Sequence, residues 1–208
     1  VVMPANETDV IATLALASEH AVPVVPRGSG CASGGQALGP VAAASTVPGL
    51  VIDASRHLRK VVAFDAACGL VEVQPGLTLG ELNDLVRPHG WWLPLEGAGD
   101  AQASLGGLVG CDAIGARTVG SGRIGAHLES IVALLNDGTR QTFGAFGASG
   151  AGSGVRLASG RISALVSALF ERTARDRDAL HARRASAVGA VGGYRLDALD
   201  PPGGAVNL

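Results

Sequence analysis

Apolar residues in the first part of the chain follow two different spacings. From Val10 to Ala17 they recur at i, i+4 and i+7, which predicts a helix from about Thr8 to His20. Short apolar runs flank this helix at Val1–Met3 and at VPVVP, residues 22–26. The order of strand, helix and strand predicts a βαβ unit at the start of the chain.

The middle of the chain contains apolar runs of strand length, and the last of them alternates strictly between apolar and polar positions. These runs predict strands at residues 50–55, 61–67 and 69–76. The segment LESIVALLNDGTRQTFG predicts a hairpin that turns at Asp137–Gly138, because Asp-Gly suits the tight turn between two strands.

Helical patterns punctuate the remainder of the chain. Thr78 and Glu81 have the spacing of a capping box at the start of a short helix. A further helical piece is predicted at Leu105–Asp112, and an amphipathic helix at residues 161–184. The tail contains two adjacent prolines, and the sequence predicts no final element there.

Composition excludes several classes of protein. Hydrophobic residues make up 47% of the 208 residues and charged residues 16%, which is typical of a globular chain. A net charge of −2 argues against nucleic-acid binding, and no apolar run reaches the ~20 residues of a membrane span. The three cysteines show no C-x-x-C spacing, so neither a metal site nor a disulfide framework is predicted. A cytoplasmic location follows, with peripheral attachment to the inner face of the membrane left open.

Glycine gathers in RGSGCASGG, residues 27–35, directly after an apolar run. Successive N–H groups of such a bare backbone can form a concave nest for phosphate, and Arg27 adds positive charge. The stretch matches neither the Walker loop nor the Rossmann fingerprint. A ligand-binding loop and a merely flexible loop therefore both remain open at this point.

A second glycine-rich segment, SLGGLVGCDAIG at residues 104–115, surrounds the short apolar helix predicted above. Two glycine-rich loops suit a ligand that carries two phosphates and two ring systems. Both segments are therefore candidates for contacting one dinucleotide.

Together these segments resemble the FAD-linked oxidases whose FAD domain is named after vanillyl-alcohol oxidase and p-cresol methylhydroxylase. Among them, the chain is most similar to the group that includes D-lactate dehydrogenase and glycolate oxidase subunits. The segments VPVVPRGSGCASGG, VEVQPGLTLGELNDLVRPHGWWLPLEGAGDAQASLGGLVGCDAIG and GSGRIGAHLESIVALLNDG carry the resemblance, which extends to about Gly144. The tail VGGYRLDALD also resembles a stretch of the hydroxy-acid dehydrogenases.

The resemblance implies an α+β fold, the two-subdomain FAD-binding fold of the p-cresol methylhydroxylase type, with the cap domain absent. Residues 1–56 would form a small βαβ subdomain and residues 57–155 a larger α+β subdomain, with FAD between them. Residues 156–208 would form a helix and an irregular tail that leads toward the missing cap domain.

The resemblance also implies which residues bind FAD. The diphosphate would be wrapped by Pro26, Arg27, Gly28, Ser29, Gly30, Cys31 and Ala32. The flavin and its ribityl chain would be lined by Gly97, Ala98, Gly99, Asp100, Ser104, Gly106, Gly107 and Gly110. The backbone of Ile131 and Val132 would pair with the adenine end.

Some positions differ from the family pattern. Cys31 stands where relatives have Thr or a flavin-linking His, so a thioether to the flavin and a small non-covalent loop residue are both open. Asp112 replaces a common Asn. Ser121 replaces a Tyr, and the segment to Ala126 lacks the family's Thr-Arg-Asp.

The implied activity is the oxidation of a small 2-hydroxy acid, such as D-lactate or glycolate, by FAD. No catalytic residue is named, because the family's cap domain carries the substrate-binding side chains; a missing cap domain or a partner subunit would complete the site. The alternatives are a non-catalytic flavin-binding or scaffold subunit, and an α/β domain whose glycine and alanine content mimics the motifs.

Overall fold

The computed structural model describes residues 1–32, 34–38, 49–95, 101–147, 160–186, 199 and 205–207. The chain forms two compact units. The first comprises Val1–His127 with Asn136–Gly138, and the second comprises Leu128–Leu135 with Thr139–Leu208.

The first unit opens with helix α1 (Glu7–Glu19), which begins where the sequence predicts. The side chain of Asn6 caps it by accepting a hydrogen bond from the Asp9 N–H at 3.0 Å. This satisfies one of the N–H groups that the first helical turn leaves unbonded.

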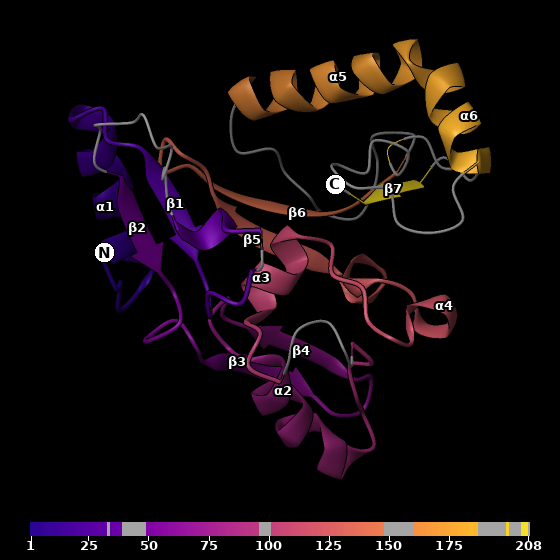
Figure 1. Ribbon diagram of the computed structural model, residues 1–208, viewed down its shortest axis with the longest axis horizontal. Coiled ribbons are helices and arrows are strands. Elements are labelled where there is room, and N and C mark those ends of the chain that lie inside the picture. The colour runs from indigo at the N-terminus through magenta and orange to yellow at the C-terminus, as the bar shows by residue number, and fades with distance from the viewer. Residues whose placement is uncertain are drawn as a thin grey trace. The chain divides into compact units, whose positions relative to one another are not determined.

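Strands β1 (Val24–Arg27) and β2 (Leu50–Asp53) pair in parallel and lie side by side in Figure 1. The strand predicted at Val1–Met3 is reduced to a single parallel bridge between Val2 and Ile52. Pro4 follows directly and has no N–H to donate, so the pairing does not extend further in that direction.

A separate antiparallel pair is formed by β3 (Val61–Asp65) and β4 (Leu70–Val73). Both are shorter than the predicted runs, because residues 66–69 form the turn between them and a second turn at residues 75–76 follows β4. Phe64 and Val71 are cross-strand partners, and both pack against the buried core.

Helix α2 (Leu79–Val86) has the predicted capping box. Thr78 Oγ1 accepts a hydrogen bond from the Glu81 N–H, and Glu81 accepts one from the Thr78 N–H. A 3-10 turn, η2 (Arg87–His89), extends the helix to Gly90. Gly90 ends it with φ +83°, a left-handed conformation that glycine adopts without strain.

The starts of α2 and α3 (Leu105–Gly110) are related by a local two-fold arrangement that the sequence reading did not predict. Thr78 and Ser104 form an antiparallel bridge. Leu79 N–H donates to the Ala103 carbonyl at 2.9 Å, and Leu105 N–H donates to the Leu77 carbonyl at 2.8 Å. The two sequences, TLGEL at 78–82 and SLGGL at 104–108, occupy equivalent positions.

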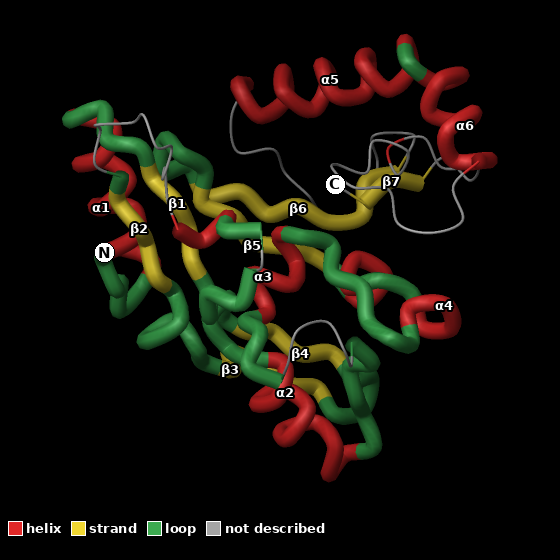
Figure 2. The backbone as a smooth tube through the Cα atoms, viewed as in Figure 1, coloured by secondary structure: helices red, strands yellow, loops and turns green. Residues whose placement is uncertain are grey.

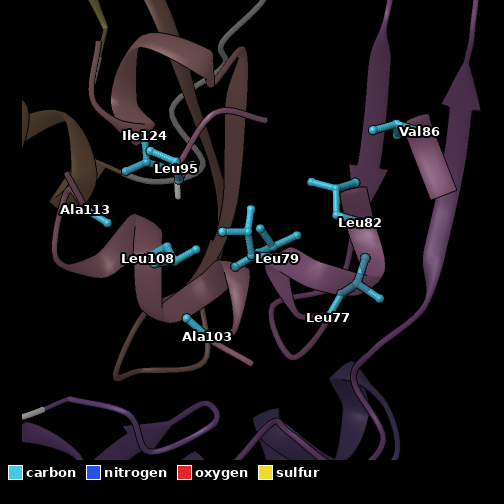
Figure 3. Close-up of a cluster of buried hydrophobic side chains, with 10 residues drawn as sticks. Leu77, Leu79, Leu82, Val86, Leu95, Ala103, Leu108, Ala113 and Ile124 are labelled. Atoms are coloured by element: carbon cyan, nitrogen blue, oxygen red, sulfur yellow. The ribbon is translucent and has the colours of Figure 1, made fainter. Parts of the chain in front are cut away.

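The core of the first unit is built around these two helix starts. Figure 3 shows Leu79 of α2 and Leu108 of α3 pointing toward each other. The other buried members are Leu77, Leu82, Val86, Leu95, Ala103, Leu105, Ala113 and Ile124. Because both helix starts carry leucines into this cluster, hydrophobic burial holds the second glycine-rich segment in place.

Three short elements of the first unit were not predicted. They are η1 (Gln36–Leu38), α4 (Thr118–Ser121) and η3 (Ile124–His127). Each is about one helical turn long, which is too short to display a hydrophobic periodicity. Figure 2 shows these short helical pieces between loops.

The second unit contains an antiparallel sheet in the order β5 (Ser130–Leu134), β6 (Arg140–Gly147), β7 (Ala205–Asn207). The hairpin of β5 and β6 confirms the predicted Asp137–Gly138 turn. The expectation that the tail has no final element was wrong, because β7 pairs with the end of β6. A three-residue strand depends on its partner rather than on its own pattern.

Helices α5 (Gly160–Arg175) and α6 (Arg177–Ser186) cover the stretch where one amphipathic helix was predicted. They are separated at Asp176, although its N–H still donates to the Arg172 carbonyl at 3.0 Å. The side chains of Ile162 and Val166 are buried, as the predicted apolar face requires.

Candidate functional site

The first glycine-rich stretch forms a loop at the carboxyl end of β1 that is half-buried at residues 28–29 and exposed at residues 30–32. We call residues Gly28–Ala32 the glycine loop. Gly30 has φ +78°, a conformation that an L-residue with a side chain adopts only under strain. Among the residues that the structure describes, no group accepts a hydrogen bond from the N–H groups of Gly28, Gly30, Cys31 and Ala32. Unbonded N–H groups of this kind are free to bind an anion.

Arg27 brings positive charge to the glycine loop. Its guanidinium lies directly beneath Gly30, so that a Cβ at Gly30 would be 2.6 Å from Arg27 Nη2. Arg27 Nε lies 3.8 Å from Asp53 Oδ2, a distance suited to an ion pair but too long for a hydrogen bond. Nε is buried without a hydrogen-bond partner in the described part of the chain.

Asp53 was not named by the sequence reading, although it belongs to the site. It is the strand partner of Arg27 in the β1–β2 register, and it is buried. Its Oδ1 accepts hydrogen bonds from the backbone and hydroxyl of Ser55, which fixes the carboxylate. The sequence does contain an indication of this pair. The segments VVPR and LVID each end in a charged residue at the carboxyl end of a predicted strand.

The structure brings the two glycine-rich segments together through Ser29 and Ser104. The Ser29 N–H donates to Ser104 Oγ at 3.2 Å, and the Ser104 N–H donates to Ser29 Oγ at 3.1 Å. Ser104 is buried, with 2% of its surface exposed. A Cβ at Gly28 would overlap Ser104 Oγ, so only glycine fits there.

The remaining predicted glycines have different environments. A Cβ at Gly106 would lie 2.6 Å from Pro75 Cβ, and the Gly106 N–H donates to the Pro75 carbonyl at 2.8 Å. Close packing of the backbone therefore accounts for Gly106. A Cβ at Gly107 would meet Ser104 Oγ at 3.1 Å, whereas Gly110 faces open space.

Cys31 and Pro26 are both exposed. Cys31 Sγ lies 3.2 Å from Ser29 Oγ, so the thiol is part of the same loop arrangement. The thioether and the non-covalent role both remain predictions for this residue.

Some predicted residues lie elsewhere. Gly97, Ala98, Gly99 and Asp100 are outside the described residues. Ile131 and Val132 belong to β5 in the second unit. Within the described part of that unit, β5 pairs only with β6 and is an edge strand of its sheet. Its outer backbone groups are therefore not used by the sheet.

Asp112, where the resemblance implies Asn, forms an ion pair that the sequence did not predict. Its Oδ2 lies 2.8 Å from Arg123 Nη1, and its Oδ1 accepts a hydrogen bond from the Gly125 N–H at 3.3 Å. The negative charge is thereby neutralised within the fold. Asp112 has φ +44°, which Asp tolerates better than most side chains do.

Arg117 and Trp92 also interact in this unit. The Arg117 guanidinium carbon lies 4.9 Å from the centroid of the Trp92 ring, a cation–π contact. The neighbouring Trp91 is held by its indole N–H, which donates to the Ala66 carbonyl at 2.8 Å.

Backbone N–H groups lower the pKa of two carboxyl groups in the first unit, Glu81 and Asp65. The hydrogen bond from the Thr78 N–H holds the pKa of Glu81 below its ordinary value of 4.5. The Ala67 N–H similarly lowers the pKa of Asp65. In the described ranges, no group of three or more His, Cys, Asp or Glu side chains could hold a metal ion.

The loop residues fit a dinucleotide cofactor. A row of unbonded N–H groups, an adjacent guanidinium and a second segment held against the loop together suit a diphosphate. None of the helices in the described part of the chain is both long and apolar enough to cross a membrane.

A sequence profile of the family described as "FAD binding domain" matches residues 1–144. The chain belongs to this family, and its cofactor is FAD. The predicted resemblance and the predicted cofactor are both confirmed. The chain carries the mixed helix and sheet content of an FAD-binding domain of the p-cresol methylhydroxylase type.

Individual relatives are similar over about two thirds of the chain. The D-2-hydroxyglutarate dehydrogenase of Escherichia coli is 29% identical over 141 residues, which cover 66% of this chain and 13% of that protein. The D-lactate dehydrogenase of Archaeoglobus fulgidus is 32% identical over 141 residues, covering 66% and 29% respectively. The chain thus spans less than a third of the length of these curated relatives.

Among solved structures, an alkyldihydroxyacetonephosphate synthase matches with a TM-score of 0.58 and 23% sequence identity. The match covers 69% of this chain and 25% of that protein. This likeness shows a shared fold.

Proposed function

We propose that this chain is the FAD-binding part of an oxidoreductase that oxidises a small 2-hydroxy acid, such as D-lactate or glycolate. The observation that carries the proposal is the glycine loop, in which the N–H groups of Gly28, Gly30, Cys31 and Ala32 have no acceptor among the described residues and which Ser104 holds against α3. The names of two relatives, D-2-hydroxyglutarate dehydrogenase and D-lactate dehydrogenase, support the substrate class.

In this proposal residues 28–32 wrap the FAD diphosphate, which the main-chain N–H groups of Gly28, Gly30, Cys31 and Ala32 bind, and Arg27 balances its charge. Gly97–Asp100, Ser104, Gly106, Gly107 and Gly110 line the flavin and ribityl chain. The outer backbone edge of Ile131 and Val132 pairs with the adenine end. FAD, when bound, supplies the redox chemistry of the reaction.

The proposal keeps the two FAD-binding subdomains, at residues 1–56 and 57–155. In this proposal, the side chains that bind the substrate and transfer its protons belong to a cap domain or to a partner subunit. The chain's own residues at this site bind and orient the cofactor. The pair of Arg27 and Asp53 and the pair of Ser29 and Ser104 hold the glycine loop in position for this role.

Titration of the purified chain with FAD tests the first part of the proposal, with flavin fluorescence and absorbance as the measurements. Saturable binding at one site per chain is expected, and its absence would contradict the proposal. The full-length gene product is then mixed with a panel of 2-hydroxy acids. Bleaching of the flavin band by at least one of them is expected.

A non-catalytic flavin-binding subunit is the second candidate. It is favoured by the segment Ser121–Ala126, which lacks the family pattern and in which Arg123 forms an ion pair with Asp112. Stoichiometric FAD binding by the full-length product, without bleaching by any hydroxy acid, would support this candidate over the first.

A further inference from the structure

We propose that Ser29 and Ser104 form a latch that positions the glycine loop for FAD, so that both are positioning residues. The inference rests on the proposed function, because it takes the loop to be the diphosphate site. Two reciprocal hydrogen bonds join the loop directly to the start of α3.

The starts of α2 and α3 share the local two-fold arrangement described above. Thr78 and Ser104 occupy equivalent positions, each directly before a helix. Thr78 uses its hydroxyl to cap its own helix, by accepting from the Glu81 N–H. Ser104 makes no side-chain capping bond, and its hydroxyl accepts from the Ser29 N–H instead.

The two helix starts differ in sequence at one position that matters for capping. Glu81 completes the capping box of α2, whereas Gly107 stands at the equivalent position of α3. A side chain at 107 would crowd Ser104 Oγ, since its Cβ would lie 3.1 Å away. Ser104 thus forgoes a capping bond that stabilises helices, and its hydroxyl is directed toward the loop.

The loop is also supported from Arg27. Its guanidinium contacts Gly30 from below, and the ion pair with Asp53 holds the guanidinium in place. With Ser29 bonded to Ser104 and Gly30 resting on Arg27, the N–H groups of Cys31 and Ala32 are left unbonded within the described residues. The latch orders a short backbone before the cofactor arrives, which lowers the entropy lost on binding.

The experiment compares four single variants of the 208-residue chain. Ser29→Ala and Ser104→Ala each remove one latch acceptor. Ser104→Thr keeps a hydroxyl at position 104. Thr78→Ala is the matched control, because it removes the equivalent hydroxyl at the other helix start. The measurements are the FAD Kd, the thermal midpoint of unfolding, and amide hydrogen exchange of residues 28–32 in the FAD-free protein.

We expect each latch variant to raise the FAD Kd by about tenfold, the equivalent of one lost hydrogen bond, and to speed exchange in the loop by a similar factor. Ser104→Thr should retain binding within about threefold of the unmodified chain. Thr78→Ala should lower the unfolding midpoint yet leave both FAD binding and loop exchange within the same range.

Wild-type affinity in both latch variants would overturn the proposal. Equal weakening by Thr78→Ala would also overturn it, because the effect would then reflect general stability. If the unmodified chain takes up no FAD, the proposed function fails, and loop exchange alone decides the latch. Unchanged exchange in Ser29→Ala, whose side chain is only half-buried, would then refute it.

Discussion

Arg27 and Asp53 lie side by side at the carboxyl ends of the parallel strands β1 and β2, with Arg27 Nε 3.8 Å from Asp53 Oδ2. The strand register brings them together, and the glycine loop begins immediately after Arg27. A buried carboxylate therefore holds a cation beneath the backbone that binds the cofactor diphosphate in our proposal.

Arg27→Gln is expected to weaken FAD binding by roughly tenfold or more, because a charge-assisted interaction with the diphosphate is lost. The salt dependence of Kd should become shallower, since one cation fewer contributes. Kd measured by flavin fluorescence at several salt concentrations checks both expectations. Arg175→Gln, on α5, is the control for a simple loss of charge. Equal effects of the two substitutions would contradict a local role for Arg27.

Gly28→Ala is expected to destabilise the chain by about 1–3 kcal/mol and to abolish tight FAD binding, because the new Cβ would overlap Ser104 Oγ. Urea unfolding and FAD titration provide the measurements. Gly160→Ala makes the same chemical change where no atom of the described residues lies within 4 Å of the new Cβ, and it should be nearly neutral. A Gly28→Ala protein that binds FAD normally would show that the loop does not need this close approach.

Substitutions at Asp112 separate backbone strain from the ion pair with Arg123. Asp112→Asn keeps a side chain that tolerates positive φ but loses the charge, whereas Asp112→Ala loses both. We expect Asp112→Ala to be less stable than Asp112→Asn by about 1 kcal/mol, as measured by urea unfolding. Equal stability of the two variants would mean that the positive φ at Asp112 costs little.

Glu81 gives the first unit a pH dependence. Its folded-state pKa is lowered, chiefly by the Thr78 N–H, so its stabilising effect is fully present above the unfolded value and is lost as the pH falls through the folded pKa. The unmodified chain should therefore exceed Glu81→Gln in thermal midpoint at neutral pH. The difference should shrink as the pH drops below 4.5, and a gap that stays constant into this acidic range would argue against the lowered pKa.

Much of the fold could be predicted from local patterns. Helix α1 follows from the apolar spacing between Val10 and Ala17, and α2 follows from the capping pair Thr78 and Glu81. The β5–β6 hairpin follows from its Asp-Gly turn. In each case, residues close together in the chain contain the whole signal. Strand β7 has no such local signal, because its partner in β6 is distant from it in the sequence.

The candidate site was predicted in part. The bare backbone of the glycine loop and its resemblance to FAD-binding proteins were readable directly. The partners that shape the loop were not. Asp53 beneath Arg27 depends on strand register, and the ion pair of Asp112 with Arg123 depends on the path between α3 and η3.

The sequence by itself determined which backbone segments lack side chains, where the helices are capped and which cofactor family the chain belongs to, because composition, turn chemistry and motif spacing act over a few residues. Only the tertiary structure decided that Ser29 contacts Ser104. It also decided that the Ser104 hydroxyl bonds to the glycine loop, whereas the Thr78 hydroxyl caps its own helix. Such contacts arise when hydrophobic burial brings distant segments together, and no local pattern encodes the resulting distance.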